Sequence, residues 1–314
     1  MSSDMFGLGL DRSNTHKTLL SCIAVTKRFK SGKGSVLAVD GISFAVRNGE
    51  VIALVGESGS GKTTLAKIMA ALIPPTSGDV YFESLPLSSM SRLDLMRFRK
   101  RVQFIPQFPD LALDPTWYLY DSIAEPLRIH GMVNSRAQEL EIVRNNSSRF
   151  GLSIDQLRRK PRDLSGGEVQ RAVIARALAI NPDLVIADEP TSMLDPSTQA
   201  KIMRQLLDAH SERGFALLLV THDLDLAKAV SERICVMLKG KIVEEGSTDE
   251  IFSNPMHPYT RSLMRGEIIM KEDDWQAACP YYGQCSDRLD RCTSSYPPEL
   301  KICKERFVRC WRVA

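Results

Sequence analysis

The chain has 314 residues, 43% of them hydrophobic, with 41 Lys and Arg against 38 Asp and Glu. This length and apolar content are enough for one large domain with a small addition, or for two domains. The near balance of charge argues against a surface built to bind nucleic acid or anionic lipid. No apolar run approaches the roughly 18 residues that a membrane span needs.

The N-terminal part is predicted to be rich in strands. Residues 1–17 are polar and lack the apolar core of a signal peptide, so we expect a disordered lead-in to a cytosolic protein. Strand-like segments follow at 20–25, 36–44 and 51–55. The last of them runs into a glycine-rich turn, after which a helix is expected over 63–72.

The turn reads Gly-Glu-Ser-Gly-Ser-Gly-Lys-Thr, a pattern typical of a phosphate-binding loop when it joins a strand to a helix. Its glycines permit positive φ and close approach of backbone N–H groups to phosphate, and the helix start adds partial positive charge. Lys62 is expected to reach the β- and γ-phosphates, and the Thr63 hydroxyl to bind Mg²⁺. The structural alternative is a plain glycine-rich turn with an exposed lysine. The predicted nucleotide-binding residues here are Gly56, Glu57, Ser58, Gly59, Ser60, Gly61, Lys62, Thr63 and Thr64.

After a strand at 78–82, residues 88–160 are charged and rich in helix-forming runs, so they are predicted to form a helical insertion. Pro126 and Gly131 are expected to break its helices. Gln107, just after a strand-like segment, is a candidate ligand for the metal or the attacking water through its amide oxygen. A lone glutamine is also consistent with an ordinary exposed residue.

Two buried strands are predicted to place polar and charged side chains at one edge of the sheet. Residues 184–187 form an apolar run that ends in Asp188 and Glu189, and 216–220 form another that precedes His222. Ligands of open α/β sheets bind at the carboxyl ends of the strands. Asp188 is expected to hold Mg²⁺, Glu189 to polarise the attacking water and His222 to bond to the γ-phosphate. Alone, the two acids could be solvated strand ends and the histidine a structural group.

The C-terminal part begins with a predicted hairpin at 234–238 and 241–244, and the composition changes near 254. Cys22 and Cys235 lie in apolar strand contexts, which favours inert core positions. The other five cysteines crowd the end of the chain. In a cytosolic protein such a cluster favours a metal site over disulfides.

Residues 164–170 read Leu-Ser-Gly-Gly-Glu-Val-Gln, between the phosphate-binding loop and the two carboxylates. With these motifs in this order, residues 18–265 resemble the ATP-binding subunit of an ABC transporter. The resemblance implies an α/β fold with a RecA-like P-loop NTPase core, an antiparallel β subdomain and a helical subdomain at about 88–180. The Cys-rich C-terminal extension would be added to that core.

The resemblance also implies roles for residues whose type alone does not indicate a function. Phe29 is expected to stack on adenine. Two such domains would pack head-to-tail. Each ATP would then lie between the Walker motifs of one domain (the loop 56–63 and the segment 184–189) and Ser165, Gly166 and Gly167 of the other. Ser165 would also suit an ordinary helix N-cap, but two following glycines weaken a helix by about 1 kcal/mol each, so a cap alone does not explain them. Residues 192–195 lie where the family has its D-loop, and Met193 there replaces the usual alanine.

Residues 254–261 read Asn-Pro-Met-His-Pro-Tyr-Thr-Arg, which resembles a segment that marks the peptide/nickel importer subfamily. That subfamily implies two transmembrane permease subunits, a second ATPase that is a copy or a paralogue, and an extracytoplasmic binding protein that selects the cargo. The chain would work at the cytoplasmic face of the cell membrane, without nucleic acid. Peptide is the favoured cargo, with nickel and sugar open. Residues 117–120 and 121–126 are candidates for the permease contact, with helical core as the alternative.

Four cysteines of the tail, Cys279, Cys285, Cys292 and Cys310, are separated by five, six and seventeen residues, with Cys303 as an extra. This spacing resembles the four-cysteine tail of several importer ATPases. Four thiolates suit a [4Fe–4S] cluster or tetrahedral Zn²⁺, and unliganded thiols are the third alternative. The cluster is favoured because the spacing lacks the Cys-x2-Cys pair of most structural zinc sites.

Two rival functions follow from the same motifs. A soluble ABC-type ATPase of DNA repair or translation would carry a long coiled-coil insertion or two cassettes, and this sequence has neither. A metal-binding regulator with an attached ATPase would place the main function in the cysteine tail. Deletion of residues 270–314 distinguishes a regulatory tail from a structural one. If the tail is a regulator, the deletion should leave a folded but unresponsive ATPase, whereas loss of a structural tail should affect stability or assembly.

Overall fold

The computed structural model describes residues 17–32, 34–267, 277–303 and 305–313. The expected lead-in therefore lies, except for Lys17, outside the described residues. The chain divides into two compact units, each of which collects segments that are distant in sequence. The first unit contains Val46–Glu50, Phe82–Leu218 and the described residues before Ser21, and the second contains Ser21–Ala45, Val51–Tyr81 and the described residues from Leu219 onward.

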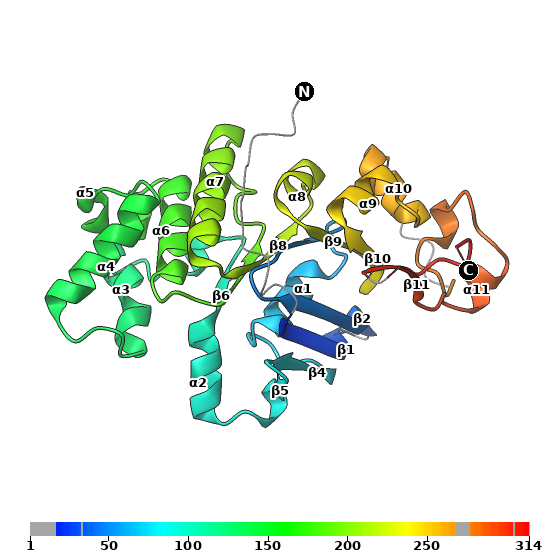
Figure 1. The fold of residues 1–314 in the computed structure, drawn as a ribbon, viewed down its shortest axis with the longest axis horizontal. Coiled ribbons are helices and arrows are strands. Elements are labelled where there is room, and N and C mark those ends of the chain that lie inside the picture. The colour runs from blue at the N-terminus through cyan, green and yellow to red at the C-terminus, as the bar shows by residue number, and fades with distance from the viewer. Residues whose placement is uncertain (1–16, 33, 268–276, 304, 314) are drawn as a thin grey trace. The chain divides into compact units, whose positions relative to one another are not determined.

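The first unit contains the predicted helical insertion. Helices α3, α4 and α6 pack on one another (Figure 1) around the buried side chains of Ile123, Leu127 and Val143. Strands β6 and β7 are parallel neighbours, with Val102 opposite Leu184. The elements of this unit are β5 (Leu85–Pro86), α2 (Arg92–Arg101), β6 (Val102–Ile105), α3 (Leu119–Ile129), α4 (Arg136–Arg149), α5 (Ile154–Leu157), α6 (Gly166–Leu178), β7 (Leu184–Asp188) and α7 (Pro196–Arg213).

The predicted helix break at Pro126 is wrong. Pro126 lies inside α3, which continues to Ile129 and ends just before Gly131. Proline has no N–H to donate to the carbonyl four residues earlier, which here belongs to Ser122. The Arg176 guanidinium takes that place, because its Nε donates to the Ser122 carbonyl at 3.1 Å. A tertiary contact from α6 thus compensates the lost helical hydrogen bond.

The second unit is built on strands in the order β11-β12-β10-β9-β3. Strands β3 and β9 are parallel, whereas β9–β10, β10–β12 and β11–β12 are antiparallel. The hairpin predicted in this region is confirmed as β9 and β10, with a bulge between Ile242 and Glu244. Its elements are β3 (Val51–Val55), α1 (Lys62–Met69), α8 (Leu224–Val230), β9 (Arg233–Leu238), β10 (Lys241–Ser247), α9 (Thr248–Ser253), α10 (Pro258–Arg265), α11 (Arg291–Ser294), β11 (Leu300–Cys303) and β12 (Arg306–Val308).

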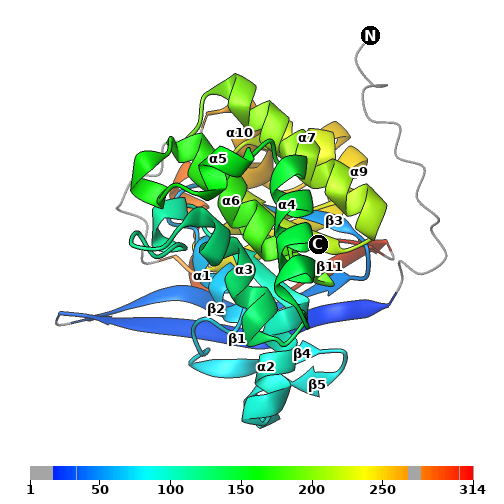
Figure 2. The same ribbon diagram turned by 90° about the vertical axis from the view of Figure 1, so that its left-hand side faces the viewer.

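A second sheet starts from strands longer than those predicted. Strands β1 (Thr18–Ser31) and β2 (Gly34–Arg47) form a long ribbon beside β4 (Ser77–Phe82) (Figure 2). Strand β8 (Ala216–Thr221) is buried at every residue, as its continuous apolar run predicts. Helix α1 ends at Met69, earlier than expected, because Ala71 adopts a left-handed conformation with φ 53°.

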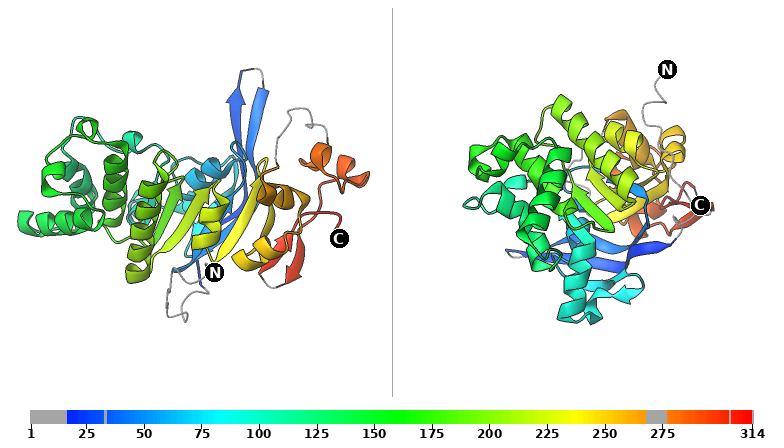
Figure 3. Two further views of the ribbon diagram at one scale, coloured as in Figure 1. Left: turned by 90° about the horizontal axis from the view of Figure 1, so that it is seen from above. Right: turned by 60° about the vertical axis from the view of Figure 1, so that its left-hand side comes forward.

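The C-terminal extension continues the sheet of the second unit. Strand β12 pairs with β10, with Val308 opposite Glu244, and Figure 3 shows the red strands of the extension beside α9 and α10. Arg306 of β12 and Glu244 of β10 form a buried ion pair at 3.0 Å, with side chains 6% and 0% exposed. Among the helices in the described ranges, none is long and apolar enough to cross a membrane.

Candidate nucleotide-binding site

The loop between β3 and α1 is confined by neighbouring backbone in a way that requires glycine at two positions. Gly61 has φ 104°, and a Cβ built there would lie 2.1 Å from the Ala38 carbonyl oxygen. A Cβ on Gly56, where φ is 153°, would lie 2.2 Å from the carbonyl oxygen of Met237. Any side chain at either position would displace a backbone segment. The sequence pattern is therefore a geometric requirement of this loop.

The same loop presents an unpartnered hydroxyl and a buried cation beside a helix start. Helix α1 begins after Gly61 with no side-chain cap and no acidic residue in its first turn, and the partial positive charge at a helix N-terminus favours an anion there. The Ser60 hydroxyl is buried, and no partner within the described part of the chain satisfies it. The buried Lys62 ammonium donates to the carbonyls of Gly56 and Glu57 at 2.8 Å each. These groups fit the phosphates of a nucleotide.

The first unit brings two predicted catalytic residues together. Glu189 directly follows β7, and Gln107 lies shortly after β6, the parallel neighbour of β7. The Gln107 amide Nε2 donates to Glu189 Oε2 at 2.7 Å. A carboxylate accepts only from the amide N–H, so the amide oxygen of Gln107 is left for a metal ion or water. Asp188, the last residue of β7, is buried.

The other predicted contacts to nucleotide lie in the second unit. His222 follows β8 and is exposed. Phe29 lies on β1 with 40% of its surface exposed, and the Lys27 ammonium is 5.3 Å from its ring centre. An exposed aromatic ring on a strand is available for stacking. Thr63 and Thr64 lie in the first turn of α1 and are partly buried.

The Ser-Gly-Gly segment forms the N-terminus of α6. Ser165 is the N-cap of a capping box, in which the Ser165 N–H and hydroxyl both donate to Glu168 Oε2 at 2.7 Å. The helix begins at Gly166. A Cβ on Gly166 would meet nothing within 4 Å, whereas one on Gly167 would lie 3.3 Å from Thr198 Cγ2. Ser165 and Gly166 are exposed, so a partner can approach this helix start.

The candidate permease contact divides into two parts. In the segment 117–120, Trp117 and Tyr118 are exposed, whereas in the segment 121–126 Ser122, Ile123 and Ala124 are buried in the helical core. Tyr118 also lines a hollow of about 630 Å³ beside α4. The first segment therefore offers aromatic surface, and the second is mostly core, as the alternative expectation stated.

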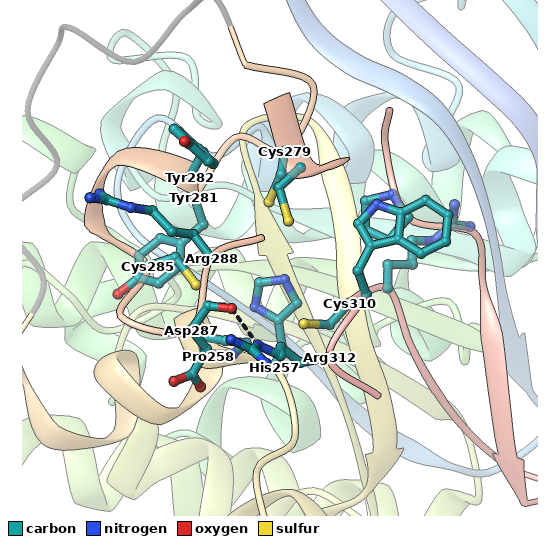
Figure 4. Close-up of a pocket in the computed structure, with 14 residues that line it drawn as sticks. His257, Pro258, Cys279, Tyr281, Tyr282, Cys285, Asp287, Arg288, Cys310 and Arg312 are labelled. Atoms are coloured by element: carbon teal, nitrogen blue, oxygen red, sulfur yellow. Dashed lines mark hydrogen bonds between the residues drawn. The ribbon is translucent and has the colours of Figure 1, made fainter. Parts of the chain in front are cut away.

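Four of the five tail cysteines line one cavity. Figure 4 shows the sulfur atoms of the labelled Cys279, Cys285 and Cys310 turned toward a common space beside His257, and Cys292 lines the same cavity. Cys303 lies on β11, outside this lining, with its exposed thiol 3.9 Å from Glu250 Oε1. The structure thus brings together the four cysteines selected by their spacing and separates the fifth.

None of the described cysteines forms a disulfide, and no group of three or more metal-binding side chains within the described residues is already arranged as a metal site. Burial raises the pKa of Cys279 to about 11, and burial also raises the pKa values of Cys285 and Cys310. These three thiols are therefore neutral at pH 7 in the absence of a cation. The core cysteines Cys22 and Cys235 are buried, as expected.

One residue at the loop was not predicted from the sequence. Tyr259, in the Pro-containing segment 254–261, is fully buried, and its hydroxyl accepts the Glu57 N–H at 3.0 Å. Pro258 and His257 favour a helix start just before it, since His257 caps α10 and Pro258 occupies its first turn. The partner of Tyr259 lies 202 residues away, which local patterns cannot indicate.

The glycine-rich loop between β3 and α1, with the carboxylates that end β7, defines a P-loop nucleotide-binding protein. Residues 39–192 match the family described as ABC transporter, and residues 243–292 match the oligopeptide/dipeptide transporter C-terminal region. The oligopeptide transport ATP-binding protein OppF of Streptococcus mutans is 41% identical over 253 residues, covering 80% of this chain and 82% of OppF. The chain belongs to the ATP-binding subunits of ABC transporters.

Solved structures support the same family. A dimeric ATP-binding cassette, in a post-hydrolysis state with ADP and Pi, is 31% identical with a TM-score of 0.68, covering 73% of this chain and 99% of that one. The cbiO1 protein of Clostridium perfringens, part of the ABC transporter complex cbiONQ, is 27% identical with a TM-score of 0.65, covering 76% of this chain and 92% of its own. The expected P-loop NTPase fold is confirmed.

Proposed function

We propose that the chain is the ATP-hydrolysing subunit of an importer of di- or oligopeptides, placed at the cytoplasmic face of the cell membrane. The match of residues 243–292 to the oligopeptide/dipeptide transporter C-terminal region carries the proposal. The identity to OppF over 80% of the chain supports the same cargo class. Import of nickel or sugar through the same kind of assembly is the alternative.

In this proposal the loop of the second unit binds the phosphates of MgATP. Lys62 moves its ammonium from the loop carbonyls to the β- and γ-phosphates, and Ser60 satisfies its hydroxyl there. Thr63 and Asp188 would be ligands of Mg²⁺, which would supply charge neutralisation at the transferring phosphoryl group. Phe29 stacks on the adenine.

Glu189 is the proposed general base. Its carboxylate takes a proton from the attacking water, and the Gln107 amide holds the carboxylate in position through the 2.7 Å hydrogen bond. The Gln107 amide oxygen would bind the metal ion or the attacking water, so this side chain would sense whether the nucleotide is present. His222 donates to the γ-phosphate. These assignments use groups that the fold supplies at the ends of β6, β7 and β8.

The exposed start of α6 is the proposed contact to the nucleotide of a second ATPase. Ser165, Gly166 and Gly167 offer a helix N-terminus, and Gly166 has open space around it. ATP would then hold two ATPases together, and hydrolysis would release them. The second ATPase is a copy of this chain or a paralogue.

Two transmembrane permease subunits are the proposed partners in the membrane, with an extracytoplasmic binding protein delivering the cargo to them. Trp117 and Tyr118 are the exposed aromatic residues that we assign to the permease contact. Aromatic side chains are enriched where protein surfaces dock. The buried residues of the segment 121–126 would pack beneath these aromatic side chains and hold them in place.

The cysteine cavity is the proposed site of a [4Fe–4S] cluster, with Zn²⁺ as the alternative. Its donor set fits, because four sulfur ligands line one cavity. A bound cluster would supply a cross-link between the two ends of the extension. The raised pKa values of the thiols mean that loading releases protons and is favoured by higher pH.

The cluster assignment predicts that Cys310→Ser abolishes iron binding, whereas Cys303→Ser leaves it unchanged. The first substitution removes a thiolate from the cavity, and the second removes one from outside it. Iron, sulfide and zinc analysis of anaerobically purified protein, with an absorbance spectrum, measures this. About four irons per chain are expected for the wild type and Cys303→Ser. One zinc and no iron would establish the zinc alternative. Full iron content in Cys310→Ser as well as in Cys303→Ser would exclude the cavity as the cluster site.

The phosphate-binding role predicts that Lys62→Ala weakens MgATP binding by about ten- to a hundredfold, because a hydrogen bond to a charged group contributes roughly 1.5–3 kcal/mol. Lys67→Ala, on the same helix, is the control and should bind as the wild type does. Isothermal titration with MgATP measures both. Unchanged affinity in Lys62→Ala would remove this loop from the nucleotide site.

A further inference from the structure

Tyr259 lies between two features of the second unit that the proposed function treats separately, the phosphate-binding loop and the cysteine cavity. The hydroxyl of Tyr259 accepts the Glu57 N–H at 3.0 Å, directly after Gly56, where the loop begins. The side chain of Tyr259 is 0% exposed, so its hydroxyl is shielded from solvent. Burial raises the pKa of Tyr259 above its ordinary value, which keeps the hydroxyl neutral.

The position of Tyr259 is determined by surrounding groups. His257 Nδ1 accepts the Tyr259 N–H at 3.0 Å, and both oxygens of the Glu244 carboxylate accept backbone N–H groups, those of Met256 and His257, at 2.9 Å. Burial lowers the pKa of His257 to about 3, so its ring is neutral and can accept. The buried Glu244–Arg306 pair anchors this arrangement to the sheet.

The ring of Tyr259 connects this anchor to the cysteine cavity. Tyr281 packs edge-on against it, with ring centres 5.5 Å apart and planes at 71°. Tyr281 lies on the short segment between Cys279 and Cys285 and lines the cavity (Figure 4). Both cysteines also pack on the apolar cluster that contains the two tyrosines. A shift of the cavity lining would therefore displace the Tyr281 ring, and through it the ring of Tyr259.

We propose that Tyr259 is a positioning residue for the phosphate-binding loop and that Tyr281 transmits the loading state of the cysteine cavity to it, so that nucleotide affinity depends on that state. The coupling part rests on the proposed metal site. The physical reason is that the loop binds phosphate only in one backbone conformation. If that conformation is less populated, the apparent Kd rises in inverse proportion.

The first test is Tyr259→Phe, which removes only the hydroxyl and keeps the buried ring. The Glu57 N–H loses its acceptor, and the loop can relax toward another partner. The Kd for MgADP, measured by isothermal titration, is expected to rise about five- to thirtyfold. Tyr296→Phe is the matched control: it makes the same chemical change at a buried hydroxyl that has no hydrogen-bond partner among the described residues and lies outside the cavity lining, so the Kd should not change.

The second test compares chain purified anaerobically with chain stripped by a chelator and then offered Zn²⁺ or no metal. The Kd of the wild type for MgADP is expected to differ at least about fivefold between loaded and stripped protein, and to differ far less in Tyr259→Phe. This readout is binding, so it does not depend on turnover.

Each failure has a separate meaning. A Tyr259→Phe chain with the wild-type Kd overturns the positioning role, even if its melting temperature falls. A wild-type Kd that is the same in both metal states, or cysteines that take up neither iron nor zinc, overturns the coupling. A wild-type chain that binds no MgADP contradicts the proposed function itself.

Discussion

Glu189→Gln is expected to abolish ATP turnover while MgATP binding persists. The substitution removes the proton acceptor but keeps the shape of the side chain. In the wild type Gln107 Nε2 donates to Glu189 Oε2 at 2.7 Å, and the amide oxygen of the new glutamine can accept the same N–H. Loss of a general base costs about 10²- to 10⁴-fold in rate. Because ATP would hold two ATPases together until it is hydrolysed, an ATP-bound dimer should accumulate. Phosphate release and light scattering after gel filtration measure both effects.

The matched control is Glu141→Gln, which makes the same chemical change on an exposed position of α4. It should leave turnover and dimerisation as in the wild type. Continued hydrolysis by Glu189→Gln would exclude Glu189 as the base. Loss of nucleotide binding in that variant would instead point to a structural role at the end of β7.

Arg306→Ala is expected to lower the free energy of unfolding by about 3–5 kcal/mol, because it leaves the buried Glu244 carboxylate without its cationic partner. The two side chains are 6% and 0% exposed and 3.0 Å apart. Strand β12 would lose its anchor on β10, and the segment that carries Tyr259 would lose part of its support. Urea unfolding followed by circular dichroism measures the change.

Arg265→Ala is the control for this prediction. Its partner, Glu267, is 3.8 Å away, and the two side chains are 67% and 58% exposed, so the pair contributes only about 0–1 kcal/mol. An Arg306→Ala variant that loses no more stability than Arg265→Ala would show that the extension is held by its backbone pairing alone.

The sequence predicted the elements whose information is local. The phosphate-binding loop lies within one strand-turn-helix unit, and the buried strands β7 and β8 are continuous apolar runs, so their residues identify them. The pairing of Gln107 with Glu189, 82 residues apart, was accessible only through the order of the family motifs. The four cavity cysteines were selected because their spacing resembles the four-cysteine tail of several importer ATPases.

The features that sequence reasoning missed depend on tertiary contacts. Pro126 remains inside a helix because Arg176, on another helix, satisfies the carbonyl that proline leaves free. The Glu57–Tyr259 hydrogen bond joins segments 202 residues apart, and no local pattern of either segment indicates the other. Residues beyond 254 looked like a separate addition because their composition changes, but backbone pairing joins β12 to β10.

The measurement that tests the central proposal most directly is uptake of labelled di- and oligopeptides by cells that lack this chain. Peptide uptake should be lost on deletion, restored by the wild-type chain and not restored by Glu189→Gln. Labelled nickel and sugars, measured in the same cells, cover the alternative cargoes. Peptide uptake that survives deletion, with loss of nickel or sugar uptake instead, would contradict peptide import while keeping the ATPase. Unchanged uptake of all three would contradict the importer.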